Sequence, residues 1–247
     1  SQLIIVMKII LENWRKYLGE SKAKVSDAMS EVAFNTMSAE SVFDGAVTEA
    51  EGQFVYQVSL AKEPSKEVIT RFNESLYGGK RAGFMSAYSI EELSRMDLYL
   101  LDGHNAGFAI KDGDDIVSVH NNSDLRGLGS EFMRKAKEVG GKRLDHFDGF
   151  LSGLYRKYGF TDVYEIYQWD EQYKPEKWTY TPVDALNPKT SVYADSLKDM
   201  IYDNPGTLPN EAVEAEAEDS FAVTINPKLK FNSYKYGRPD VIMRKLG

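Results

Sequence analysis

The chain has 247 residues, of which 42% are hydrophobic, and a formal net charge of −8 at pH 7. This is an ordinary globular composition, enough for one large domain or one domain plus an appendage. The absence of cysteine excludes disulfides and thiolate chemistry, and with only three histidines a histidine-rich metal site is not expected.

The acidic charge does not favour nucleic-acid binding, although a local basic patch would still permit it. No apolar run reaches membrane-spanning length, so no membrane partner is expected. The opening SQLIIVMKII lacks a basic leader and a small-residue cleavage site. The expected location is therefore the cytoplasm.

The first half of the chain predicts helices and one early strand. Residues 1–50 read as a helical extension, because apolar residues recur there at helical spacing. QFVYQVSLA over 53–61 alternates apolar and polar residues, as a half-buried strand does. Residues 64–67 start a helix that runs to about Tyr77, and Ser89 opens another short helix.

A close series of strands and helices follows. Asp112-Gly113 is a hairpin signal between the second and third strands. The predicted strands are 98–103, 106–111, 115–121, 143–148, 160–169 and 239–246, and the predicted helices are 127–139 and 149–159. Short hairpins make the middle of the sheet antiparallel, and later strands are joined through helices. The expected fold class is α/β, with a mixed, mostly antiparallel central sheet flanked by helices.

Residues 170–238 separate the last two predicted strands. The run EAVEAEAED (211–219) is interpreted as a solvated loop or an exposed helix. Aromatic residues gather at the start of the segment, namely Trp169, Tyr173, Trp178 and Tyr180. Either an exposed partner surface or a small buried core is consistent with them.

A glycine turn precedes the helix predicted over 127–139. Arg126-Gly127-Leu128-Gly129 follows a polar turn, and glycines let an anion approach the free N–H groups of a helix N-terminus. A tight turn without a ligand is the alternative. The dinucleotide pattern is incomplete, because Phe132 stands where its last glycine belongs, and no Walker lysine follows. The expected anion is therefore a phosphate group, but in neither a dinucleotide-binding nor a Walker-type site.

A second motif, LYRKYGF (154–160), lies about 25 residues downstream. Together the two motifs resemble the GNAT superfamily of acyl-CoA-dependent N-acyltransferases, and more loosely its bacteriophage and mobile-element members. The resemblance covers roughly residues 53–169 and 239–246. Asp124 departs from the Gln or Arg that usually begins the family's phosphate loop. The implied organisation is an extension (1–50) and a GNAT-like domain (51–247) with an insertion (170–238).

The resemblance implies acetyl-CoA as the acyl donor. The strands 115–121 and 143–148 would splay apart, and the pantetheine arm would bond to the backbone near Val117 and Val119. The pyrophosphate would be held by the amides of Arg126, Gly127, Leu128, Gly129 and Ser130.

The resemblance also implies catalytic roles. Tyr155 would protonate the departing thiolate, although packing on the helix face is its alternative. His120 suits proton removal near neutral pH, and Asp148 would orient the substrate or act as a base. Their alternatives are a strand-end histidine that is exposed or hydrogen-bonded and a helix N-cap aspartate, and some family members use water chains instead of a base.

The leading functional prediction is an N-acetyltransferase that transfers the acyl group directly to an amine in a ternary complex. The acceptor, a small molecule or a protein, is not specified by the sequence, and neither is the oligomeric state. One alternative is a phage enzyme that modifies nucleic-acid bases. The other is a non-catalytic GNAT-fold interaction or virion-associated protein.

Overall fold

The structure is a computed structural model. It describes residues 48–50, 53–55, 58–61, 64–79, 85–86, 88–101, 103–175, 178–203, 205–217 and 221–247. The helical extension expected over 1–50 lies outside these residues, except that β1 (Thr48–Ala50) pairs with β2 (Gln53–Val55). The described residues divide into two compact units: the first runs up to Gly141 and includes Pro175, and the second contains the remaining residues from Lys142 onward.

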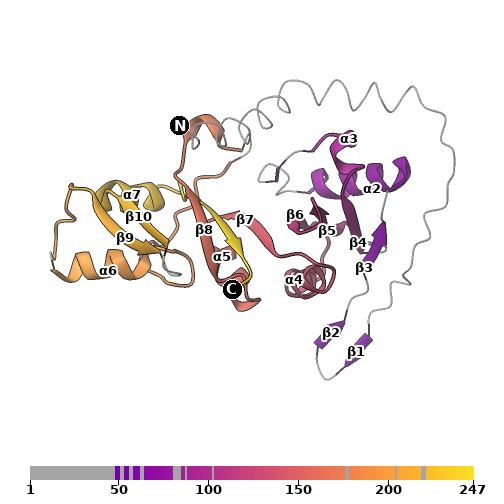
Figure 1. Cartoon of the computed structure of the whole chain (residues 1–247), viewed down its shortest axis with the longest axis horizontal. Helices are drawn as coiled ribbons and strands as arrows, with labels where there is room; N and C mark the ends of the chain where they lie inside the picture. The colour runs from indigo at the N-terminus through magenta and orange to yellow at the C-terminus, as the bar shows by residue number, and fades with distance from the viewer. Residues whose placement is uncertain are drawn as a thin grey trace. The chain divides into compact units, whose positions relative to one another are not determined.

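The first unit contains an antiparallel sheet in the order β3-β4-β5-β6 (Figure 1). Its strands are β3 (Val58–Ala61), β4 (Asp97–Leu101), β5 (Ala106–Lys111) and β6 (Asp115–Asn121). The single strand expected over 53–61 is two strands, β2 and β3. The hairpin expected between β5 and β6 is confirmed. Asp112 and Gly113 both have positive φ, of 53° and 83°, as a type I′ turn requires.

Two helices of the first unit begin where the sequence predicts them. The Ser65 side chain accepts a hydrogen bond of 3.3 Å from the Val68 N–H at the start of α2 (Lys66–Tyr77). At the start of α3 (Ile90–Leu93), Ser89 and Glu92 form a reciprocal capping box. Each cap satisfies amide donors that the first helical turn leaves unpaired.

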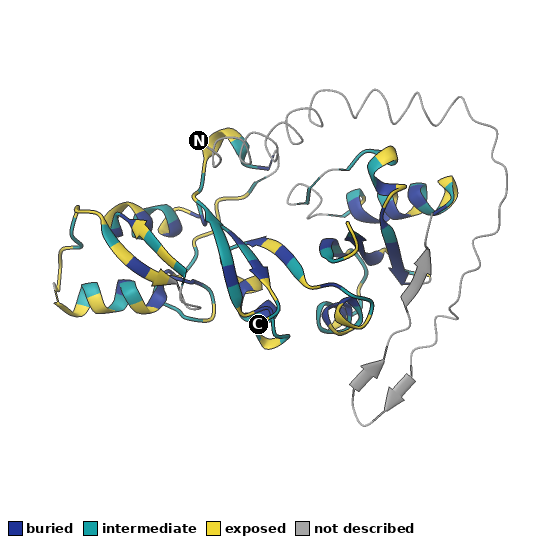
Figure 2. Cartoon of the chain, in the orientation of Figure 1, coloured by how far each residue is buried: buried dark blue, intermediate teal, exposed yellow. Residues whose placement is uncertain are grey.

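Helices cover both faces of the first sheet. Successive strand side chains point to opposite faces, and the buried residues of β4 and β5 are dark blue in Figure 2. On one face α2 packs in a cluster that includes Ile69, Phe72, Leu76, Leu98 and Leu100. On the other, the ring of Tyr99 stacks on Phe108 at 4.5 Å, and Phe108 contacts Phe132 of α4 (Leu128–Glu138) at 5.6 Å.

The second unit contains three adjacent strands in the order β7-β11-β8, so that the last strand of the chain lies in the middle. The strands are β7 (Arg143–Phe147), β8 (Asp162–Tyr167) and β11 (Val241–Lys245), and α5 (Phe150–Lys157) connects β7 to β8. Strand β11 pairs antiparallel with both neighbours. It follows that β7 and β8 run parallel to each other, and that β11 is the strand that joins them.

The 170–238 segment folds as structured additions to this sheet. It contains η2 (Glu171–Tyr173), α6 (Ala194–Asp203), β9 (Val213–Ala217), β10 (Phe221–Ile225) and α7 (Pro227–Lys235). Both α6 and α7 lie beside the β9–β10 hairpin (Figure 1). Buried side chains of the 170–238 segment and of the sheet form one core. It includes Val163, Val192, Tyr193, Leu197, Ala215, Ile225, Tyr234 and Ile242.

The loop or helix expected for EAVEAEAED is wrong, because this run contains strand β9. Ala215 is buried and Val213 is half-buried, whereas Glu214 and Glu216 are exposed. Glutamate and alanine favour helices, but the period of two matches a strand with one buried face. Packing therefore overrides composition here.

The expected fold class is confirmed at the level of an α/β fold with a mostly antiparallel sheet flanked by helices. Among the helices that the structure describes, none combines the length and the apolar character needed to cross a bilayer.

Candidate functional site

Strand β6 carries a β-bulge in the stretch where a cofactor arm is expected. Gly107 of β5 lies opposite His120, but Ala109 lies opposite Val117. Two residues of β6, Ser118 and Val119, therefore lie opposite a single residue of β5, Phe108. Ser118 has a φ of +55°, which is the left-handed conformation. A bulge interrupts the hydrogen-bond ladder and turns backbone groups away from the neighbouring strand, and bulges are over-represented beside active sites.

The side chain of His120 holds the backbone of this bulge. Its Nδ1 lies 2.8 Å from the Ser118 carbonyl oxygen, and its Nε2 lies 2.7 Å from Oγ of Ser75 on α2. A carbonyl oxygen only accepts, so Nδ1 carries the proton, and Nε2 of the neutral ring accepts from the Ser75 hydroxyl. The ring of His120 also meets Phe72 edge-on at 5.3 Å.

Burial keeps His120 neutral. The side chain is 3% exposed. Burial lowers its pKa to about 4, although the bond to the Ser118 carbonyl opposes this shift. Of the two alternatives to a base, the structure has the hydrogen-bonded one. The role of a general base stays a prediction, and the observed contacts make His120 a residue that positions Ser118.

The hydroxyl of Ser118 is buried and has no hydrogen-bond partner within the described residues. An unsatisfied buried hydroxyl costs about 1–3 kcal/mol, and a non-glycine residue in a strained backbone conformation costs on the order of 1–3 kcal/mol more. Both costs fall on one residue of β6. The sequence did not single out Ser118, since DIVSVHN contains no glycine that would signal a bulge.

The loop after β6 is ordered by its own side chains. The Asn121 side-chain amide donates from Nδ2 to the Leu125 carbonyl at 2.7 Å. Its Oδ1 accepts from the Ser123 backbone N–H at 3.0 Å and from the Ser123 hydroxyl at 2.7 Å. The Asn122 amide donates to the Ser75 carbonyl at the end of α2, at 2.6 Å. Short polar side chains that bond to nearby backbone favour such turns over helix or strand. They also fix the direction in which α4 starts.

The glycine turn presents unpaired amides at the start of α4. Gly127 is the N-cap residue, with a φ of +80°, and it supplies no side-chain cap. Its carbonyl accepts from the amides of Ser130 and Glu131 at 3.0 and 3.4 Å, which leaves the amides of Leu128 and Gly129 without a partner inside the helix. Arg126 and Gly127 are exposed. Such a helix start attracts anions.

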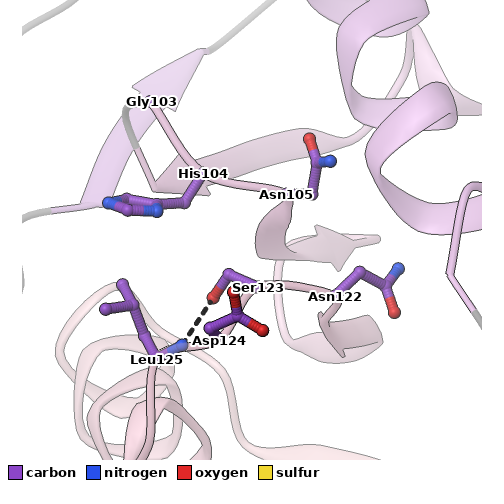
Figure 3. A pocket seen from close by; sticks show the side chains of 7 residues that line it. All are labelled: Gly103, His104, Asn105, Asn122, Ser123, Asp124 and Leu125. Carbon is purple, nitrogen blue, oxygen red and sulfur yellow. Dashed lines mark hydrogen bonds between the residues drawn. The ribbon is translucent and has the colours of Figure 1, made fainter.

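A polar hollow of about 310 Å³ adjoins this turn. Figure 3 shows its lining side chains, which come from the β4–β5 turn (Gly103, His104, Asn105) and from the loop after β6 (Asn122, Ser123, Asp124, Leu125). Within the loop the Leu125 amide donates to Oγ of Ser123 at 3.3 Å. Asp124, the position that departs from the family's loop, therefore borders the hollow and brings a carboxylate to it.

Tyr155 lies in the second unit, on α5. It is 6% exposed, and its ring contacts those of His146 and Phe160 at 5.1 and 6.5 Å. Burial, reinforced by the charge of Asp145, raises the pKa of its phenol. No hydrogen bond to its hydroxyl occurs among the described residues. The side chain packs as its alternative interpretation expects.

Asp148 is 1% exposed and accepts three hydrogen bonds. The donors are the Ser152 hydroxyl at 2.5 Å, the Val192 amide at 2.9 Å and the Tyr234 hydroxyl at 2.8 Å. The helix N-cap expected at Asp148 is wrong, because Gly149 occupies that position. Burial raises the pKa of Asp148 against the opposing effect of the three bonds. The role of a base stays a prediction, and the contacts alone give Asp148 a structural role.

A second buried carboxylate, Asp240, completes the network around Asp148. Its Oδ1 accepts from the Trp169 amide at 3.0 Å, and its Oδ2 accepts from the Tyr193 hydroxyl at 2.9 Å and forms an ion pair with Lys230. The Asp148 amide donates to the Asp240 carbonyl at 2.7 Å. The sequence did not indicate this network, because its members lie far apart in the chain.

The predicted site residues thus fall into two sets. Val117, Val119, His120 and the glycine turn (126–130) lie in the first unit, along β6 and at the start of α4. Tyr155 and Asp148 lie in the second unit. The splaying of β6 from β7 stays a prediction.

Comparisons with known proteins add no family assignment. Searches against protein-family models, curated proteins and solved structures found no match to this chain. The likeness to the GNAT superfamily therefore rests on the two motifs in the sequence, and function has to be argued from the site.

Proposed function

We propose that the chain is an acyl-CoA-dependent N-acyltransferase, with acetyl-CoA as its donor. The observation that carries the proposal is the combination, on one strand–turn–helix unit, of the bulge at Ser118 and the uncapped N-terminus of α4 at Gly127. A bulge supplies backbone groups outside the ladder, and an uncapped helix start supplies amides for a phosphate.

The glycine turn suits a pyrophosphate for three reasons. The amides of Leu128 and Gly129 have no acceptor among the described residues, the helix dipole adds partial positive charge, and Gly127 has no Cβ in the way. A Cβ built on Gly127 would meet open space, so the φ of +80° rather than crowding is what calls for glycine there. Glu131 is the one acidic residue of the first turn, and Arg134 forms an ion pair with it at 3.0 Å.

Ser118 supports the binding of the acyl arm. Its hydroxyl is desolvated and unpartnered among the described residues. A ligand carbonyl that accepts a hydrogen bond from it would remove the free-energy cost of the unsatisfied donor. His120 holds the Ser118 carbonyl and thereby fixes the conformation of the bulge. The donor, once bound, supplies an acyl thioester for attack by the acceptor amine.

The tyrosine of the second motif fits the role of an acid. Departure of the thiolate needs a proton, and the raised pKa of Tyr155 means that its phenol is protonated at neutral pH. Within the described residues its hydroxyl makes no hydrogen bond that would have to break first. Proton removal from the amine is left to His120, Asp148 or water, as the resemblance implies.

Calorimetric titration with acetyl-CoA tests the proposal. Gly129→Glu puts a carboxylate among the amides proposed for the pyrophosphate, and Gly129→Gln adds nearly the same bulk without charge. We expect the parent to bind, Gly129→Glu to lose binding, and Gly129→Gln to retain part of it. An acidic residue in the first turn stabilises a helix by about 0.3–1 kcal/mol, so thermal melting of Gly129→Glu should not fall.

The same titration can refute the proposal. If the folded parent does not bind acetyl-CoA, or if Gly129→Glu binds it as the parent does, the glycine turn is not the phosphate site. The chain would then be better treated as a non-catalytic interaction protein. Coenzyme A without the acyl group, titrated in parallel, separates recognition of the nucleotide end from recognition of the thioester.

A further inference from the structure

A group of aromatic side chains, here called the aromatic platform, lies in the second unit and takes no part in the proposed acyl transfer. Its members are Phe147, Trp169, Trp178, Tyr180 and Tyr236. Phe147 and Trp169 contact Trp178 with ring centroids 4.5 and 4.9 Å apart, and Tyr180 meets the edge of Trp169 at 6.3 Å. These half-buried rings pack against exposed Tyr180, and exposed Tyr236 lines the same hollow as Tyr180.

Glu171 ties the exposed part of the platform together. Its carboxylate accepts from the Tyr180 hydroxyl at 2.7 Å and from Nε1 of Trp169 at 3.2 Å, and it pairs with Nε of Arg238 at 2.5 Å. The bond from Tyr180 is the largest of the effects that lower the pKa of Glu171. The carboxylate is therefore ionised at neutral pH, where it accepts from two rings of the platform and pairs with Arg238.

A close backbone contact fixes the platform from below. Nε1 of Trp178 donates to the Gly237 carbonyl at 2.9 Å. Gly237 has a φ of +70°, and a Cβ there would lie 2.4 Å from the Tyr180 carbonyl carbon. The chain at Tyr180 thus lies directly on the turn between α7 and β11. Rings held in this way lose little freedom when a ligand stacks on them.

The platform borders an open hollow of about 460 Å³ lined by Tyr180, Tyr236 and Arg238. The guanidinium of Arg238 lies over the Tyr180 ring, 5.4 Å from its centroid, and the Arg238 side chain is 43% exposed. The ion pair with Glu171 uses Nε. The two terminal nitrogens of Arg238 carry four further N–H donors. The hollow therefore offers ring faces and a planar fork of hydrogen-bond donors.

We propose that this hollow binds a nucleotide unit, with its base stacked on the exposed tyrosine rings and its oxygen acceptors on Arg238. Bases stack on aromatic side chains irrespective of sequence, and guanidinium matches phosphate and base-edge acceptors in a bidentate manner. The volume lies within the range of small-ligand sites. The net charge of −8 does not favour a long phosphate footprint, so the proposal is for one or a few nucleotides.

The proposal does not rest on acyl transfer, and its test has to distinguish nucleotide binding at the hollow from coenzyme A binding at the glycine turn. Because coenzyme A itself contains an adenine nucleotide, the probe is uridine monophosphate. Two of the three tryptophans, Trp169 and Trp178, belong to the platform. Quenching of tryptophan fluorescence therefore reports stacking nearby, and calorimetry on the same samples reports binding by heat. Both are done on the full chain and on Gly129→Glu, which should bind uridine monophosphate as the parent does.

Substitutions at Tyr236 and Arg238 locate the site. Tyr236→Ala removes a ring that is 58% exposed and should weaken binding about tenfold, whereas Tyr236→Phe should stay within about twofold because the stacking face is kept. Arg238→Gln should weaken binding and reduce its salt dependence by about one phosphate contact. Tyr202→Ala is the matched control, since Tyr202 on α6 is 80% exposed and lies outside the hollow, and it should bind as the parent does.

The outcomes are distinct. Saturable binding that Tyr236→Ala weakens and Tyr202→Ala does not supports the site, and a tighter complex with a short single-stranded oligouridine than with the monomer would make a strand its source. Equal binding of the two would make a free nucleotide the source. No saturable binding by the folded parent overturns the proposal. So does parent-like binding by Tyr236→Ala, or equally tight binding of inorganic phosphate, which has no ring to stack.

Discussion

The Tyr234 hydroxyl donates to the Asp148 carboxylate across 2.8 Å, so that helix α7 of the 170–238 segment completes the hydrogen bonding of a residue at the end of β7. Both residues are buried, and Asp148 takes its other donors from Ser152 and Val192. The segment therefore contributes to the interior of the second unit and is not an appendage on its surface.

Removing that donor should destabilise the second unit. Tyr234→Phe keeps the ring but leaves a buried carboxylate with one hydrogen bond fewer, which costs about 1–3 kcal/mol of unfolding free energy. Urea unfolding followed by circular dichroism measures it. Tyr202→Phe, at an exposed position, should change stability by less than about 0.5 kcal/mol. Equal effects of the two substitutions on the unfolding free energy would mean that the bond from Tyr234 to Asp148 does not stabilise the fold.

His120 should make the fold sensitive to acid. Its pKa is about 4 in the folded chain against 6.5 when unfolded. The unfolded state therefore binds more protons between these values, and this contribution is fully present above pH 6.5 and lost as the pH falls through about 4. It amounts to at most about 3 kcal/mol. A histidine NMR titration measures the pKa directly, and an inflection near 6.5 for His120 would contradict the buried arrangement.

Ser118→Ala should separate stability from ligand binding. Removing a buried hydroxyl that has no partner among the described residues should leave the unfolding free energy unchanged or raise it by about 1 kcal/mol. If the hydroxyl meets the acyl arm, the affinity for acetyl-CoA should fall about tenfold in calorimetry. A gain in stability with unchanged affinity would confine Ser118 to a structural role.

Tyr155 offers a similar separation through two substitutions. Tyr155→Phe keeps the contacts with His146 and Phe160, and its melting temperature should match the parent, whereas Tyr155→Ala should lose about 3–5 kcal/mol of stability. If the phenol is the acid, Tyr155→Phe should slow coenzyme A release during turnover of an amine that the parent acylates. Parent-like turnover would leave packing as the only role of this residue.

The strands and helices from 97 to 167 could be predicted to within a few residues because each has its own periodicity and its own turn. Strands β5 and β6 have the predicted bounds, since Asp112-Gly113 provides both the turn and its positive φ values. The 211–219 run was misjudged because glutamate and alanine suggest a helix, and the alternation that indicates β9 is only a few residues long.

The candidate site was predictable only in part. Gly127 could be placed at a helix start because glycine signals both a positive φ and an exposed N-terminus. The bulge could not, because Ser118 adopts a conformation that serine rarely adopts, and the support comes from Ser75 through His120. Contacts between residues distant in the chain, such as Asp148 with Tyr234, leave no local pattern.

The central position of β11 has a consequence for the order in which the second unit forms. Strands β7 and β8 are both made before the 170–238 segment, yet each pairs with β11, which is made after it. On the ribosome the two earlier strands must therefore wait with unpaired edges until synthesis has passed the whole segment. Pairings this distant in the chain form slowly, and exposed edges invite aggregation meanwhile. Slowing translation within the segment should therefore lower the yield of folded protein.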